Sequence, residues 1–147
     1  MNCDDVEILF AEDSMDDAML TIRALTKSGF TNKLLHVKDG AEALDFFYCQ
    51  GQYASRNNKE NPKLILLDLK MPKMSGIQVL EKIKANPDLK SIPVVILTSS
   101  REDPDIEKCY TLGANSYIVK PVDSHSFFQA IEKIGMYWMI LSQSPHS

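Results

Sequence analysis

Short apolar runs alternate with segments of helical periodicity along this chain, and that alternation constrains the fold more than any other feature. Two runs, at residues 64–67 and 94–97, are apolar at every position, as expected of strands covered on both faces of a sheet. Between the runs, apolar residues recur every three or four positions, as they do from Met15 to Leu25. Five such strand–helix units with short links predict a parallel sheet with helices on both faces.

Capping and turn residues indicate where these elements begin and end. Strands are expected at residues 7–11, 33–38, 63–68, 93–98 and 116–119. Helices are expected within residues 14–29, 40–49, 75–86, 103–113 and 124–142. Ser14 is expected to cap the first helix with Asp17 as its capping-box partner, and Asp103 to cap the fourth. The polar residues 50–62 predict a mobile surface loop, and residues 39–40 a plain turn.

Composition and charge argue against several classes of protein. The 147 residues, 44% hydrophobic and 24% charged, suit a single domain with a core from about residue 6 to 142 and a tail from 143 to 147. The formal net charge of -4 argues against nonspecific nucleic-acid binding. Three scattered cysteines without a C-x-x-C pair indicate reduced thiols. Because neither a signal peptide nor an apolar run of about 20 residues is evident, we expect a cytoplasmic protein with no membrane and no nucleic-acid partner.

Acidic residues end the first and third predicted strands. Glu12 and Asp13 follow the first strand, and Asp68 ends the third. Open α/β sheets bind ligands at the carboxyl ends of their strands, so neighbouring strands would bring these acids together. Two unit charges about 4 Å apart repel by about 4 kcal/mol at an effective dielectric of about 20, so a proton or cation must lie among them. Oxygen ligands without His or Cys suit Mg²⁺. Taken singly, each acid is equally consistent with a solvated strand end or a helix cap.

Thr98 and Lys120 end the fourth and fifth predicted strands. Either residue alone is consistent with an ordinary exposed strand end. Combined with three acids, they make a more specific set, because a hydroxyl and an ammonium can hold the oxygens of a phosphoryl group while a carboxylate attacks phosphorus. The set therefore indicates phosphoryl transfer.

These residues resemble the receiver domains of two-component response regulators. The resemblance spans residues 6–141 and is carried by Glu12-Asp13, Asp68, Met71-Pro72 with Gly76, Thr98 and Tyr117-x-x-Lys120-Pro121. It implies a flavodoxin-like, doubly wound α/β fold with a five-stranded parallel sheet of order 2-1-3-4-5. It also implies a stand-alone phosphorelay receiver. Such a protein is not an enzyme, but a phosphoacceptor that assists its own phosphorylation and dephosphorylation.

The resemblance also assigns a metal site. It implies that Asp68 is the phosphorylated residue, and that Asp13 and Asp68 ligate Mg²⁺ together with the backbone carbonyl of Lys70. Glu12 would act on the metal through water. Glu12 departs from the family pattern, which more often has Asp there, and its longer side chain could shift the water network.

Further roles follow from the same resemblance. Thr98 and Lys120 would contact the phosphoryl group, and Tyr117 would change rotamer together with Thr98. The peptide bond after Lys120 would be cis. Lys70 and Ser100 occupy the two positions that tune the lifetime of the phosphoryl group in this family.

Partners are suggested by two other parts of the sequence. Residues 68–73 and 86–90, with Trp138, resemble the small regulators paired with bacterial phytochromes, which implies a phytochrome-type or other histidine kinase as phosphoryl donor. The last helix carries more apolar residues than one buried face needs, which predicts a homodimer, with a helix covered by the tail as the alternative. The surplus consists of Phe128, Met136, Tyr137, Met139 and Ile140. The downstream target is expected to be a protein.

Three other functions fit the architecture less well. An FMN-binding protein would need a Ser/Thr/Gly-rich loop after the first strand, where Glu12 and Asp13 would repel the phosphate. An aspartyl phosphatase would have a second acid two residues after the nucleophile, where Lys70 stands. A degenerate receiver that binds partners without phosphorylation would not be expected to keep the full set of acids, threonine and lysine.

Overall fold

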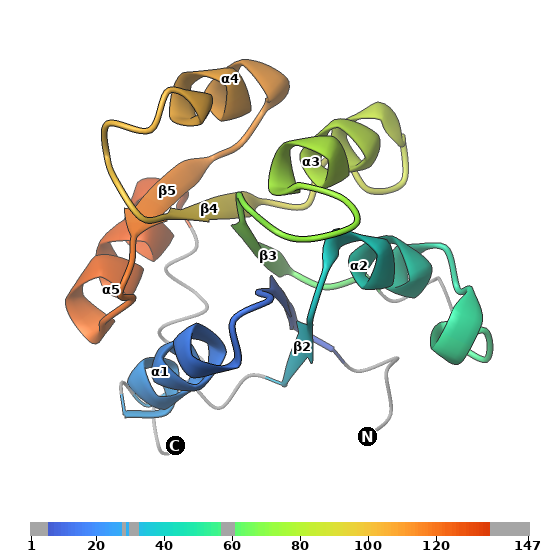
Figure 1. The fold of residues 1–147 in the computed structure, drawn as a ribbon, viewed down its shortest axis with the longest axis horizontal. Helices are drawn as coiled ribbons and strands as arrows, with labels where there is room; N and C mark the ends of the chain where they lie inside the picture. The colour runs from blue at the N-terminus through green and yellow to red at the C-terminus, as the bar shows by residue number, and fades with distance from the viewer. Residues whose placement is uncertain (1–5, 28, 30–32, 57–60, 136–147) are drawn as a thin grey trace.

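A single parallel sheet forms the centre of the protein (Figure 1). The computed structural model describes residues 6–27, 29, 33–56 and 61–135. The strands are β1 (Ile8–Ala11), β2 (Leu34–Val37), β3 (Leu64–Asp68), β4 (Val94–Thr98) and β5 (Ser116–Val119). They lie in the order β2-β1-β3-β4-β5, and every neighbouring pair is parallel. The predicted α/β class and strand order are confirmed.

Helices cover both faces of the sheet (Figure 1). Helices α1 and α5 pack on one face, and α2, α3 and α4 pack on the other. Their bounds are α1 (Met15–Lys27), α2 (Gly40–Phe47), α3 (Gly76–Ala85), α4 (Asp105–Leu112) and α5 (Ser124–Lys133). No helix in the described ranges is long and apolar enough to cross a membrane.

Side chains of successive strand residues point to two separate hydrophobic cores. In β1, Ile8 and Phe10 pack with α1 and α5, whereas Leu9 and Ala11 pack with α2 and α3. All residues of β3 and β4 are buried, which explains their uninterrupted apolar sequence. Full burial of a leucine or isoleucine side chain contributes about 1.5–3 kcal/mol, so these central strands hold the carboxyl ends of the sheet in place.

The plain turn predicted at residues 39–40 is wrong. The Asp39 carboxylate accepts a hydrogen bond from the Glu42 backbone N–H at 2.7 Å, and Asp39 is the N-cap of α2. Gly40 is already in the helix, where an added Cβ would collide with the backbone oxygen of Met74. Asp39 therefore anchors α2 next to the strand end.

The polar segment after α2 is more ordered than its composition predicts. It contains a 3-10 helix (Gly51–Tyr53), and both Tyr53 and Arg56 are buried. The Tyr53 hydroxyl donates to a Glu42 carboxylate oxygen at 2.7 Å, and the Arg56 guanidinium donates to the Phe46 carbonyl at 3.0 Å. The predicted surface loop therefore contains a short 3-10 helix and two buried side chains, and its predicted mobility stays a prediction. Residues 57–60 lie outside the described part of the chain.

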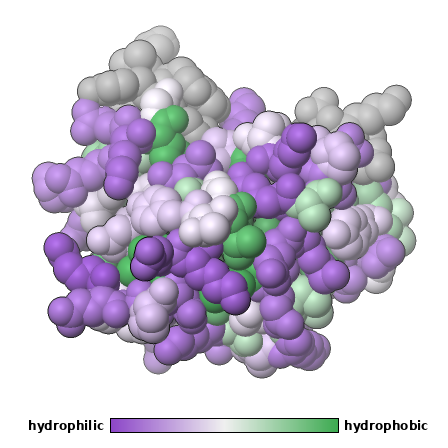
Figure 2. Space-filling model, turned by 90° about the horizontal axis from the view of Figure 1, so that it is seen from above, coloured by the Kyte–Doolittle hydropathy of each residue, from purple (hydrophilic) through white to green (hydrophobic). Residues whose placement is uncertain are grey.

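The described part of α5 tests the predicted partner surface at one residue. Phe128 is half-buried and packs against the core beneath α1 and α5, so it contributes to the protein's own interior. The other four residues of the predicted surface, at positions 136, 137, 139 and 140, lie outside the described residues. The face seen in Figure 2 is largely hydrophilic with small separate hydrophobic areas, so helices and polar side chains cover most of the core there.

Candidate functional site

The carboxyl ends of β1, β3, β4 and β5 surround a small cavity of about 130 Å³. Its lining brings together most of the residues predicted from the sequence. These residues are Glu12, Asp13, Ser14, Asp17, Asp68, Leu69, Lys70, Thr98, Ser99, Asp103 and Lys120. The parallel pairing of β1 with β3, and of β4 with both β3 and β5, places them at one edge of the sheet.

Three carboxylates in the cavity are arranged as a possible metal site. One oxygen each from Glu12, Asp13 and Asp68 lies within 4.8 Å of the others. Glu12 and Asp68 are buried, whereas Asp13 is exposed. A set of carboxylate oxygens without nitrogen or sulfur fits a hard divalent cation such as Mg²⁺ or Mn²⁺. The predicted convergence of acids from the first and third strands is thus present.

Glu12 accepts hydrogen bonds through both of its carboxylate oxygens and through its backbone carbonyl. Its Oε1 accepts from the Lys120 Nζ at 3.1 Å, and its Oε2 accepts from the Ser14 backbone N–H at 3.1 Å. The His36 Nε2 donates to the Glu12 carbonyl at 2.7 Å. The Glu12 side chain therefore both holds the turn into α1 and contacts Lys120.

The capping box predicted at Ser14 is half right. The Ser14 hydroxyl accepts from the Asp17 backbone N–H at 3.2 Å, as expected of an N-cap. The reciprocal bond, from the Ser14 N–H to the Asp17 carboxylate, is replaced by a bond from the same N–H to the Glu12 carboxylate. The Asp17 carboxylate instead pairs with Lys120 at 3.2 Å.

Asp68 ends β3, and only 4% of its surface is exposed. Burial, reinforced by the nearby charge of Glu12, raises the pKa of Asp68 to about 7, although the Lys120 ammonium at 3.3 Å acts in the opposite direction. A carboxylate with such a pKa is destabilised by its surroundings when it is ionised. A bound cation would remove that penalty, which is consistent with the acids being metal ligands.

Lys120 is at the centre of the charge network. Its Nζ lies 3.1 Å from Glu12 Oε1, 3.2 Å from Asp17 Oδ2 and 3.3 Å from Asp68 Oδ1. Burial by itself would lower the pKa of Lys120, but the charge of Asp68 and the hydrogen bonds to Glu12 and Asp17 raise it above its ordinary value. Lys120 is therefore a permanent ammonium at neutral pH. The predicted cis bond between Lys120 and Pro121 is present.

Thr98 lines the cavity, but its hydroxyl is bonded to the loop that follows β4. It donates to the Ser100 carbonyl at 3.1 Å, accepts from the Ser100 N–H at 3.3 Å and lies 3.5 Å from Asp103 Oδ2. Ser100 itself is exposed and is not part of the cavity lining, and its Oγ accepts from the Glu102 N–H. Lys70 is exposed at the rim of the cavity.

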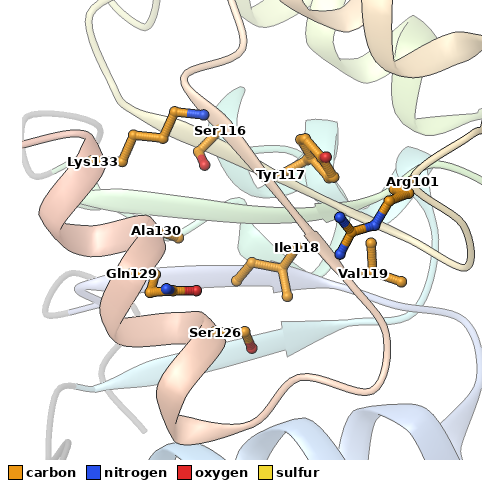
Figure 3. A pocket seen from close by; sticks show the side chains of 9 residues that line it. All are labelled: Arg101, Ser116, Tyr117, Ile118, Val119, Ser126, Gln129, Ala130 and Lys133. Atoms are coloured by element: carbon orange, nitrogen blue, oxygen red, sulfur yellow. The ribbon is translucent and has the colours of Figure 1, made fainter.

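Tyr117 lies apart from the acidic cavity, in the middle of β5. It is half-buried, and its ring meets the Tyr110 ring of α4 edge-on with centroids 6.2 Å apart. It lines a second, larger cavity of about 460 Å³ between β5 and α5 (Figure 3). Arg101 and Lys133 contribute positive charge to this second cavity. A change at Tyr117 would therefore alter a surface distinct from the acidic cavity.

Sequence reasoning missed two acids of the cavity. The sequence predicts helix-cap roles for both Asp17 and Asp103. The N-cap of α4 is Pro104, one residue after Asp103, whose Oδ1 accepts from the Asp105 N–H at 2.9 Å. Both nevertheless line the cavity. The available signal was their position, because each lies within five residues of a strand end that carries a predicted site residue.

Comparison with known proteins places this arrangement in a family. Residues 8–132 match the family described as the response regulator receiver domain. The response regulator Rcp1 of Synechocystis sp. is 40% identical over 132 residues, which cover 90% of this chain and 88% of Rcp1.

Three solved structures are similar throughout the fold. The bacteriophytochrome response regulator RtBRR is 46% identical with a TM-score of 0.83, over 89% of this chain and 78% of RtBRR. The Mn(2+)-bound form of Rcp1 is 39% identical with a TM-score of 0.72, over 90% of this chain and 93% of the other. The phosphorylated cyanobacterial phytochrome response regulator RcpA is 37% identical with a TM-score of 0.70, over 95% of this chain and 97% of RcpA.

Proposed function

This chain belongs to the response regulator receiver family of phosphorelay signalling proteins, and we propose that Asp68 is the residue that accepts the phosphoryl group. One observation carries the assignment. Asp68 is the buried carboxylate that ends the central strand β3, within 3.3 Å of the Lys120 ammonium and within 4.8 Å of two further acids. Glu12 is committed to Ser14 and Lys120 through both oxygens, and Asp13 is exposed, which supports the buried Asp68 as the proposed nucleophile.

In the proposed reaction a carboxylate oxygen of Asp68 attacks the phosphorus of a phosphohistidine or of a small acyl phosphate. A new oxygen–phosphorus bond forms as the bond from phosphorus to the donor atom breaks, and the donor keeps the electron pair. A histidine donor then takes a proton and becomes neutral imidazole. The Lys120 ammonium neutralises charge on the transferred group, and the Thr98 hydroxyl donates to it after leaving Ser100.

Asp13, Asp68 and the Lys70 backbone carbonyl would hold Mg²⁺ in this proposal, with Glu12 acting through water. When bound, the ion supplies positive charge that offsets the mutual repulsion of the acids and of the incoming phosphoryl oxygens. The close approach of the carboxylates and the raised pKa of Asp68 support this site. The Mn(2+)-bound form of the relative Rcp1 supports a divalent ion in general.

The same residues would assist removal of the phosphoryl group by water. Lys70 at the cavity rim and Ser100 beyond Thr98 are proposed to tune the lifetime of the aspartyl phosphate. Lys70→Asn removes the positive side chain beside the cavity, so the rate of dephosphorylation should change. An unchanged rate in a time course of intact masses would remove Lys70 from the proposal.

Signalling is proposed to run from Thr98 to Tyr117. Thr98 is bonded to Ser100 in the present structure, and a phosphoryl group on Asp68 would offer its hydroxyl a stronger, charged acceptor. Movement of Thr98 would then let Tyr117 change rotamer, remodel the second cavity and alter a protein-binding surface (Figure 3). Crystal structures with and without beryllofluoride should contain two Tyr117 rotamers, and a single shared rotamer would argue against the switch.

The proposed partners follow from the relatives. A histidine kinase of the phytochrome type is proposed as donor because RtBRR and RcpA are described as bacteriophytochrome and phytochrome response regulators. A cytoplasmic location and an unidentified protein target are parts of this proposal. The homodimer predicted through Phe128, Met136, Tyr137, Met139 and Ile140 stays a prediction, and sedimentation as a monomer with and without phosphorylation would contradict it.

Intact mass spectrometry after incubation with Mg²⁺ and acetyl phosphate tests the assignment of Asp68. The wild-type chain should gain one phosphoryl group, and Asp68→Asn should gain none. Asp88→Asn provides a control, because it removes an exposed acid outside the cavity and should be modified like the wild type. Phosphorylation of Asp68→Asn at the wild-type rate would refute the assignment.

A further inference from the structure

We propose that Asp17 is a positioning residue that holds the Lys120 ammonium in the cleft when a cation binds among Glu12, Asp13 and Asp68. This inference rests on the proposed function, because it concerns the same phosphoryl transfer. Asp17 is on the first turn of α1, and its carboxylate is not part of the group of three acids that could ligate a metal.

The Lys120 ammonium has a limited capacity for hydrogen bonds. An ammonium has three N–H donors and no acceptor. Three carboxylates lie around it at 3.1, 3.2 and 3.3 Å, from Glu12, Asp17 and Asp68 respectively. Glu12 and Asp17 accept hydrogen bonds from this ammonium, whereas Asp68 forms an ion pair with it, so Asp17 accepts one of the two side-chain hydrogen bonds that Lys120 donates among these acids.

A bound cation would compete with Lys120 for Glu12 and Asp68. Glu12 and Asp68 both belong to the carboxylate group that fits a divalent cation. A cation among those oxygens weakens their attraction for Lys120 and repels the ammonium, since both carry positive charge. Asp17 alone of the three partners lies outside that group, so its attraction for Lys120 persists.

Asp17 is held in place through its own backbone. Its backbone N–H donates to the Ser14 hydroxyl at 3.2 Å, which fixes the first turn of α1 against the loop that carries Glu12 and Asp13. Its side chain is 43% exposed, whereas that of Lys120 is 17% exposed. Asp17 is thus a fixed but partly solvated anchor at the mouth of the cavity, and it keeps the flexible lysine side chain directed toward Asp68.

Phosphorylation kinetics test this role with a matched control. Asp17→Asn should slow phosphorylation by acetyl phosphate about fivefold at saturating Mg²⁺, as expected for loss of a partly exposed charged pair. Asp17→Glu should restore most of the rate. Asp16→Asn makes the same change of charge on the neighbouring residue, which is exposed and outside the cavity lining, and should leave the rate unchanged.

A double-mutant cycle separates positioning from a general effect of charge. In the Lys120→Gln background, Asp17→Asn should have no further effect on the rate, because the group that it positions is gone. Equal effects of Asp17→Asn with and without Lys120 would overturn the proposal. So would an Asp16→Asn variant as slow as Asp17→Asn.

Two readouts do not depend on phosphorylation. The free energies of unfolding of the same four proteins in EDTA should be non-additive if Asp17 and Lys120 interact, and additive values would overturn the pairing. The NMR signal of the Lys120 side chain, assigned with Lys120→Gln, should move little on addition of Mg²⁺ in the wild type and strongly in Asp17→Asn. If the wild type were not phosphorylated at all, Asp68 would fail as acceptor while these two measurements still decided the role of Asp17.

Discussion

Replacement of the buried acid Asp68 by asparagine should stabilise the metal-free protein. Asp68 is only 4% exposed and its carboxylate is close to Glu12, and both conditions disfavour the charged form of that carboxylate. Asparagine has almost the same shape and no charge. The variant therefore loses the proposed phosphoacceptor but also loses an unfavourable buried charge, as expected where a site is built for function at the expense of stability.

The size of this effect follows from the pKa of Asp68. Its folded value of about 7 lies well above the model value of 3.8. Each unit of difference corresponds to about 1.4 kcal/mol, so ionised Asp68 destabilises the fold by up to about 4 kcal/mol. This figure already includes the attraction of Lys120. The buried amide leaves some hydrogen-bonding groups unpaired, which costs about 1–3 kcal/mol, so a net gain of about 2 kcal/mol is expected, corresponding to about 4–8 °C in melting temperature.

The dependence on pH has a definite sign. Because the folded pKa of Asp68 is raised, the folded protein binds more protons than the unfolded chain between about pH 4 and pH 7. The stability of the wild type therefore falls as pH rises through this window, whereas the variant lacks this contribution. The advantage of Asp68→Asn should be small near pH 4 and reach its full size above about pH 7.

Urea unfolding in EDTA measures this difference, with Asp88→Asn as the control for loss of an exposed acid. Added Mg²⁺ should stabilise the wild type more than Asp68→Asn and reduce the gap between them. A variant that is less stable than the wild type in EDTA, or a gain that is independent of pH, would refute the argument that Asp68 is electrostatically strained.

Three further substitutions test other parts of the site. Lys120→Gln should raise the pKa of Asp68 above its present value, because the lysine charge now lowers it, and a carboxyl NMR titration with a lower pKa would contradict this. Gly76→Ala should lower the free energy of unfolding in urea by about 1–3 kcal/mol, since the new Cβ would collide with the Asp68 carbonyl oxygen. Wild-type stability of this variant would show that the backbone moves to make room there. Thr98→Val should lower the free energy of unfolding by about 1 kcal/mol, because the Ser100 N–H loses its acceptor. It should also slow phosphorylation in the mass assay, and wild-type kinetics would exclude a role for the hydroxyl.

The strands and the main site residues could be predicted because each has a local signal. The apolar runs of β3 and β4 are continuous since both faces of the sheet are covered, and this pattern appears directly in the sequence. Parallel strands then bring their carboxyl ends to one edge, which placed Asp68, Thr98 and Lys120 together. The strand order itself came from the family resemblance and could not be obtained from spacing.

The errors arose where a polar side chain had two possible partners. Asp17 had a local role as a capping-box partner, but the distant Lys120 attracts its carboxylate more strongly than a backbone N–H that Glu12 already occupies. Tyr53 lies in a polar segment that has no apolar period, yet it is buried, because its ring packs against Phe46 and its hydroxyl donates to Glu42. Both outcomes depend on contacts between residues far apart in the sequence, which local patterns do not contain.

The most direct test of the central claim is to locate the phosphoryl group after reaction with acetyl phosphate and Mg²⁺. Borohydride reduction of an aspartyl phosphate leaves homoserine at the modified position, which peptide mass mapping identifies. We expect homoserine at position 68 alone, and none when EDTA replaces Mg²⁺. Modification at Asp13 or at any other acid, or at position 68 to the same extent without a divalent ion, would contradict the account.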